Sequence, residues 1–76
     1  MNEQMFEMMR NDVKGNKELE DALEEAIKKD RYYTNAYMSG KIPEEALELV
    51  LTAVWKTYRD TVHRHYFKRF MSERGG

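Results

Sequence analysis

Apolar residues recur along this chain at the three- and four-residue spacing of amphipathic helices, and they never alternate as they would in a strand. The first such stretch covers residues 2–13, the second 17–38 and the third 43–72. The pattern therefore predicts an all-α, three-helix chain, with a short N-terminal helix followed by an antiparallel hairpin whose second helix is long. We expect residues 1–76 to form a single helical domain.

Turn-forming residues separate the three stretches. Gly15 suits the left-handed position after a helix, and Asn16 suits the capping position of the next one. The second break contains Gly40, which is expected to stop one helix, and Pro43, which is expected to start another. Because this connector is short, the helices on either side should pack antiparallel. Residues 74–76 are expected to form a frayed tail.

Asp30 interrupts the apolar stripe of the second helix, and two interpretations are open. The helix could break there, with Asp30 as the cap of a new helix that begins at Arg31. Alternatively, the helix is continuous and Asp30 is semi-buried, accepting a hydrogen bond from the Trp55 indole or from tyrosine hydroxyls. We favour the continuous helix. The apolar residues of this stripe are Leu19, Leu23, Ala26, Ile27, Tyr33 and Tyr37.

The apolar stripe of the third helix changes direction along its length. Its later members follow at spacings of four, which overshoot the 3.6-residue turn. In a hairpin folded at Gly40, Leu23 lies near Tyr58 and Lys17 near Arg64, so residues from about 65 onward should extend past the other helices. This projecting segment carries four large apolar residues, which are Tyr66, Phe67, Phe70 and Met71.

Composition limits how a chain of 76 residues can be stabilised. A chain of this size buries only about 60% of its unfolded surface, and the absence of cysteine excludes disulfides. We therefore expect a second subunit or a partner protein, and we predict a homodimer, for which Tyr66 and Phe70 are one candidate seam. The N-terminus has two acidic residues and no apolar run, and no apolar stretch of the chain is long enough to span a membrane. These features favour a soluble, cytoplasmic protein without membrane contact.

Catalytic and metal chemistry have little support in the sequence. There is no cysteine, no glycine-rich phosphate loop and no nucleophile motif. His63 and His65 point about 200° apart on a helix, so they cannot share one ion. We therefore expect neither an enzyme nor a bound cofactor or metal.

Charge is distributed unevenly along the chain. Residues 1–55 carry a net charge of −5 and residues 56–76 a net charge of +4. The basic end and its aromatic residues predict a small regulatory, adaptor or inhibitor protein that binds another protein. The expected partner-binding residues are Arg59, Tyr66, Phe67, Lys68, Arg69, Phe70 and Met71.

A nucleic-acid-binding transcriptional regulator that uses the same basic helix is the alternative. Basic side chains would contact phosphates, and aromatic rings could stack on bases. Two features weigh against it. The long helix begins with Glu44, Glu45 and Glu48, and its basic residues are spread around the helix instead of along one side.

Overall fold

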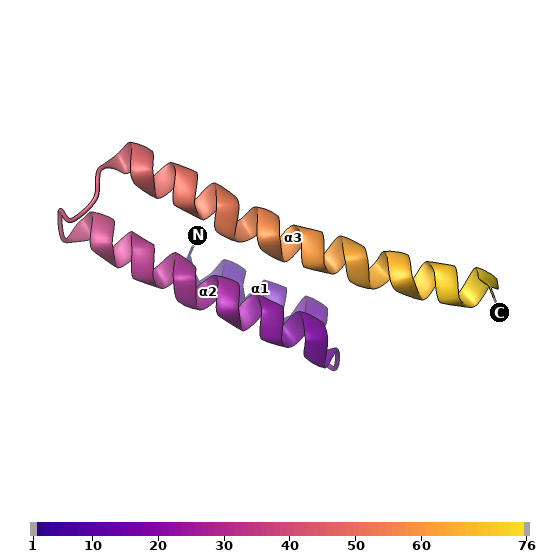
Figure 1. Ribbon diagram of the computed structural model, residues 1–76. Coiled ribbons are helices and arrows are strands. Elements are labelled where there is room, and N and C mark those ends of the chain that lie inside the picture. Colours follow the sequence, from indigo (N-terminus) through magenta and orange to yellow (C-terminus); the bar gives the residue numbers. More distant parts are fainter. Residues whose placement is uncertain (1, 76) are drawn as a thin grey trace.

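Three helices make up most of the computed structural model, which describes residues 2–75 and the side chains of residues 2–72. Helix α1 spans Glu3–Val13, α2 spans Lys17–Met38 and α3 spans Glu44–Gly75. Figure 1 shows α2 and α3 side by side as a hairpin, with α1 folded back along α2 and the C-terminal end of α3 extending beyond both. The expected all-α, three-helix chain with its helical hairpin is therefore confirmed.

Asparagine side chains cap the first two helices. The Oδ1 atom of Asn2 accepts a hydrogen bond from the backbone N–H of Met5 at 2.9 Å, and Oδ1 of Asn16 accepts one from the N–H of Leu19 at 3.2 Å. These bonds satisfy N–H groups that the first turn of a helix leaves without a partner. The capping role expected of Asn16 is confirmed.

Gly40 ends α2 in the left-handed backbone conformation, with a φ of +75°. Its N–H donates to the carbonyl of Tyr37 at 2.9 Å, and the N–H of Lys41 donates to the carbonyl of Ala36 at 2.8 Å. This pair of bonds is the Schellman arrangement, which favours glycine because a left-handed residue is strained by a Cβ atom. α3 begins directly after Pro43, as the sequence indicated to within one residue.

The hydrophobic core lies between α1 and α2 and is covered by α3. The ring of Phe6 stacks on that of Trp55 with their centroids 6.1 Å apart, so α1 reaches α3 through long side chains. From α3, Trp55, Tyr58 and Val62 pack against this core only partly buried, and none of the described α3 side chains is fully buried. The fully buried apolar residues of the described chain are Phe6, Val13, Leu19, Leu23, Ala26 and Ile27.

Asp30 is buried in the middle of α2, with only 2% of its surface exposed. Its Oδ2 atom accepts a hydrogen bond from the indole Nε1 of Trp55 at 2.7 Å, and its Oδ1 accepts one from the hydroxyl of Thr34 at 3.5 Å. The continuous helix with a hydrogen-bonded Asp30 is therefore confirmed, and the alternative of a helix break is wrong. This bond fixes how far α3 slides along α2, because it joins one residue of each helix.

Two arginine–glutamate ion pairs hold α1 against α2. Nε of Arg10 donates to Oε2 of Glu24 at 2.7 Å, and Nε of Arg31 donates to Oε2 of Glu3 at 3.0 Å. Hydrogen bonds from these arginines, with a smaller contribution from their charge, hold the pKa values of Glu24 and Glu3 below their usual range. α1 is therefore fixed by charge at its surface and by the buried ring of Phe6 beneath.

The observed boundaries differ from the expected ones chiefly at the end of α3. The helix continues to Gly75 instead of ending near Ser72, because no glycine or proline interrupts it between Pro43 and Gly75. The expected frayed tail is thus wrong for residues 74 and 75, while residue 76 lies outside the described residues. Within the described chain, no helix combines the length and the apolar character needed to cross a membrane.

Candidate functional site

His65 of α3 lies against the start of α2. The side-chain Nδ2 of Asn16 lies 2.8 Å from Nε2 of His65, and Oε2 of Glu18 lies 3.5 Å from its Nδ1. Asn16 is the residue immediately before α2, so the rest of α3 projects beyond that helix (Figure 1). The register expected from the sequence, with Lys17 near Arg64, agrees with this contact. We call residues 66–72 the arm.

The hydrogen-bonding capacity of Asn16 assigns the tautomer of His65. Oδ1 of Asn16 already accepts the N–H of Leu19, so the amide nitrogen faces the imidazole and can only donate. Nε2 of His65 must then accept, which places the ring proton on Nδ1, towards Glu18. His65 is therefore a packing residue at the end of the bundle, as the sequence indicated, whereas His63 is exposed.

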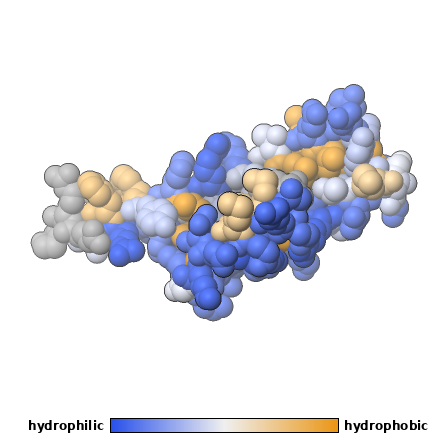
Figure 2. Space-filling view, turned by 180° about the vertical axis from the view of Figure 1, so that it is seen from behind, coloured by the Kyte–Doolittle hydropathy of each residue, from blue (hydrophilic) through white to orange (hydrophobic). Residues whose placement is uncertain are grey.

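The arm carries four large apolar side chains that the rest of the chain leaves exposed. The exposed fractions are 52% for Tyr66, 64% for Phe67, and 51% for both Phe70 and Met71. Figure 2 shows apolar side chains at this projecting end of the molecule, close to hydrophilic ones. An exposed apolar cluster of this kind, bordered by charge, usually marks an interface.

The four apolar side chains form two pairs on neighbouring sides of α3. At about 100° per residue, Tyr66 and Phe70 continue the line of Val62, which packs against the core beside α1. Phe67 and Met71 follow about 100° further round the helix and face away from α1. The arm therefore presents two adjacent apolar surfaces, each of which can be altered without the other.

Two of the predicted binding residues, Arg59 and Tyr66, meet in a shallow groove between α1 and α3. Met9 of α1 lines the same groove. Met9 was not expected to be part of the binding surface. The available signal was the methionine-rich first helix, since methionine suits surfaces that adapt to a partner. The candidate site therefore extends from the arm onto α1.

Basic side chains border the apolar surfaces of the arm. Arg59 lies on the side of Tyr66, while Arg64 and Lys68 lie on the side of Phe67, and all three basic residues are exposed. Arg69 is also exposed, and it lies on the side of α3 that, in the earlier turns of the helix, faces α2. The predicted residues are thus brought onto one projecting end but not onto one face.

Tyr58 lies beneath the site and lines the grooves on both sides of α3. Burial, with smaller contributions from Asp12 and Tyr66, raises the pKa of its hydroxyl above the ordinary value of 10.0. The neutral phenol is therefore the form that the folded chain favours.

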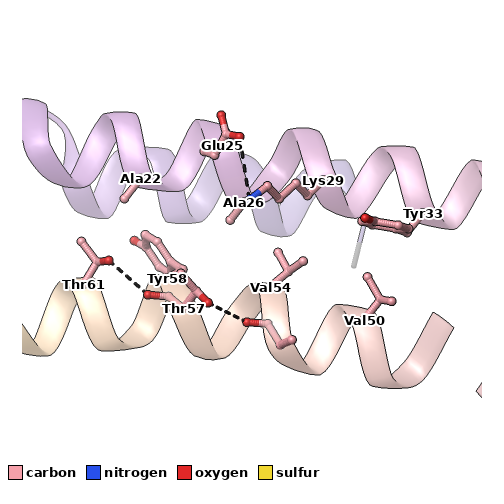
Figure 3. Close-up of a pocket in the computed structure, with 11 residues that line it drawn as sticks. Ala22, Glu25, Ala26, Lys29, Tyr33, Val50, Val54, Thr57, Tyr58 and Thr61 are labelled. Atoms are coloured by element: carbon pink, nitrogen blue, oxygen red, sulfur yellow. Dashed lines mark hydrogen bonds and ion pairs between the residues drawn. The ribbon is translucent and has the colours of Figure 1, made fainter. Parts of the chain in front are cut away.

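A second groove runs between α2 and α3, and no residue of α1 lines it. Figure 3 shows the small side chains of Ala22 and Ala26 on α2 facing α3, with the ring of Tyr58 reaching toward them and Tyr33 lying across from Val50. This groove could not be anticipated from the sequence, because alanine and threonine contribute little to an apolar stripe. The groove's remaining residues are Glu25, Lys29, Tyr33, Ala53, Thr57, Tyr58 and Thr61.

No cluster of three or more His, Cys, Asp or Glu side chains that could hold a metal ion occurs in the described part of the chain. No family model matches this chain, and no curated protein or solved structure is significantly similar to it. Its function must therefore be inferred from the chemistry of its surface.

Proposed function

We propose that this chain is a small regulatory, adaptor or inhibitor protein that acts by binding another protein through the C-terminal end of α3. The observation that supports this most directly is the projection of the arm beyond α2, which leaves four large apolar side chains at least half exposed. The proposed binding residues are Arg59, Tyr66, Phe67, Lys68, Arg69, Phe70 and Met71.

Tyr66 and Phe70 are the anchors of this surface. Tyr66 and Phe70 expose 52% and 51% of their surface, which a partner could still remove from water. Aromatic and arginine residues dominate interface energetics. Arg59 lies in the same groove as Tyr66, so an anchor and a cation lie close together. Because both aromatic residues stand on a continuous helix, they lose little backbone freedom on binding.

The charge of the basic end defines the chemistry of the partner. Residues 56–76 carry a net charge of +4, so a surface that combines an apolar groove with an acidic rim is complementary to it. Opposite charges at the rim speed association and exclude partners with a basic rim. Binding should therefore weaken as the ionic strength rises.

Nucleic-acid binding is supported less well. In the helix–turn–helix, a common DNA-binding motif, the two helices cross at about 90–120°. α2 and α3 instead run antiparallel as neighbours (Figure 1). The first turn of α3 also carries Glu44 and Glu45, where acids would repel phosphates. A random DNA duplex should therefore show no salt-dependent binding in fluorescence polarisation, and steep salt-dependent binding would favour the alternative.

Affinity capture from the native host tests the proposal when three forms of the chain are compared. Tyr66→Ser/Phe70→Ser should lose a partner that the wild-type chain retains, since it removes both anchors. Met38→Ser is the matched control, because Met38 is 76% exposed at the opposite end of the hairpin. A partner lost only with the arm variant supports the proposal. Identical captured proteins for all three forms would overturn it, once circular dichroism shows that each form is folded.

A further inference from the structure

One face of α3 carries a regular pattern that the packing within the chain does not use. Its residues follow one another at alternating intervals of three and four, which keeps them on one side of a helix and is the pattern of a two-helix seam. We call these residues the seam stripe. They are Val50, Ala53, Thr57, Asp60, Arg64, Phe67 and Met71, and all except Val50 are exposed.

We propose that the seam stripe is the interface between two copies of this chain, whose α3 helices pack antiparallel about a two-fold axis near Val62. In this register Asp60 lies opposite Arg64 of the second copy. Phe67 lies opposite Thr57 of the second copy, and Met71 lies opposite its Ala53. The inference rests on the proposed function and deepens it, because it assigns Phe67 and Met71 of the arm to a second copy of the chain. Tyr66 and Phe70 remain for another protein.

Side-chain size supports this pairing. Ala53 and Thr57 are small and line the groove between α2 and α3, whereas Phe67 and Met71 are large and exposed. Each large side chain of one copy therefore meets a small one of the other, beside this groove. The hydroxyl of Thr57 already donates to the carbonyl of Ala53 at 3.0 Å, so its burial leaves no donor unpaired.

Charge supports the same register. Asp60 and Arg64 are exposed, and neither forms an ion pair with another described side chain. In the antiparallel pair the two-fold axis brings Asp60 of each copy to Arg64 of the other, which creates two ion pairs beside the axis. Opposite charges at such positions commonly decide the register and direction of helix pairing.

The neighbouring registers lack this match. If the second copy slides by one seven-residue repeat in one direction, Asp60 meets Thr57 and Arg64 meets Ala53. The same slide in the other direction places Asp60 against Met71 and Arg64 against Phe67. Both alternatives cover charged groups without giving them a partner, which is costly. The register with Asp60 opposite Arg64 is therefore the favoured one of the three.

A second copy fits this surface because a single stripe supplies both halves of the contact. Such self-complementarity is the requirement for a two-fold interface. The antiparallel register lays each basic arm beside about residues 52–58 of the other copy, so the two arms of like charge do not meet. It also covers α3, in which no described side chain is fully buried within one chain.

Charge reversal tests the pairing by light scattering and analytical ultracentrifugation. Wild type is expected to sediment as a dimer of the 9.1-kDa chain. Asp60→Arg and Arg64→Asp should each raise the dissociation constant about tenfold or more, since each places like charges together twice. A mixture of these two variants should form a heterodimer, because the new arginine then faces the new aspartate, and the double variant should again form a homodimer.

Arg59→Asp is the matched control, because it makes the same charge change as Arg64→Asp on a face of α3 outside the seam stripe. This control should remain a dimer. Circular dichroism should show that all variants are folded, because the substituted positions are exposed. A monomeric wild type, or charge-reversal variants that dimerise as well as wild type, would overturn the inference. Either result leaves the test of the proposed function intact, because that test alters Tyr66 and Phe70.

Crosslinking through introduced cysteines tests the register itself, and the chain has no cysteine of its own to interfere. Ala53→Cys mixed with Met71→Cys should give a disulfide-linked pair of chains under mild oxidation. Val50→Cys mixed with Phe67→Cys, which represents the shifted register and leaves Asp60 and Arg64 in place, should give much less. The reverse preference would contradict the proposed register.

Discussion

The indole Nε1 of Trp55 donates a hydrogen bond to Oδ2 of Asp30 across the interface between α2 and α3, with 2.7 Å between the two atoms. Both groups would be costly to bury alone: the carboxylate because of its charge and the indole N–H because of its unpaired donor. Together they satisfy each other within an otherwise apolar core, and they set the position of α3 along α2.

Substitutions at this pair should destabilise the chain in a fixed order. Asp30→Ala leaves the indole N–H without an acceptor and should cost about 1–3 kcal/mol in the free energy of unfolding. Trp55→Phe leaves the buried carboxylate without its donor and should cost about 3–5 kcal/mol. Asp30→Asn keeps an acceptor oxygen and should cost less than Asp30→Ala. Urea unfolding followed by circular dichroism measures all three, and an unchanged midpoint for Asp30→Ala would contradict this account.

The attachment of α1 should depend on Phe6, which exposes only 1% of its surface and stacks on Trp55. Phe6→Ala should cost about 3–5 kcal/mol in the free energy of unfolding, through lost burial and the cavity left behind. Trp55 is the only tryptophan in the chain, so its fluorescence should shift to longer wavelength as water reaches it. Met5→Ala, at a position 46% exposed on the same helix, is the control and should leave the emission unchanged.

Asn16 should contribute more to stability than Asn2, although both cap a helix. Asn16→Ala removes a cap, worth about 1 kcal/mol, and also the bond to His65, worth about 1 kcal/mol more. Asn16→Ser keeps a capping oxygen but loses the amide, so about half of this cost should remain. Asn2→Ala removes a cap alone and serves as the reference. Thermal or urea unfolding compares the three variants, and equal costs for Asn16→Ala and Asn2→Ala would show that the His65 contact contributes nothing.

Alkaline pH should destabilise the folded chain through Tyr58, whose pKa is raised chiefly by burial. The folded state keeps a proton that the unfolded state releases near pH 10, so this stabilisation is complete below about pH 10 and is lost as the pH rises through the folded-state pKa. Urea midpoints measured from pH 8 to pH 11 should therefore fall more steeply for wild type than for Tyr58→Phe. Parallel curves for the two proteins would contradict the prediction.

Much of the fold could be predicted because it depends on local chemistry. Asn16 and Gly40 act through backbone geometry within a few residues, and the spacing of Leu23 and Ile27 identifies the buried side of α2 without reference to the rest of the chain. The same periodicity placed Asp30 on that side. Its hydrogen bond from the Trp55 indole was only one of two interpretations, because the spacing of residues within one helix does not fix the position of another helix.

The candidate site was predicted in part. Simple helix lengths placed Tyr66 and Phe70 beyond the start of α2, since each residue adds about 1.5 Å to a helix. The grooves beside them could not be foreseen. Met9 joins Arg59 and Tyr66 only because α1 packs at a particular angle, and Ala53 and Thr57 are too small or too polar to stand out in an apolar pattern.

By itself, then, the sequence determined where the helices of this protein begin, which side of α2 is buried, and that the basic end of α3 projects. Tertiary structure alone decided how α1 sits against α3, that Asp30 pairs with Trp55, and that a groove remains open between α2 and α3. The physical reason is that helical periodicity records the direction in which each side chain points. The distance and angle between two helices depend on how side chains from both of them pack together.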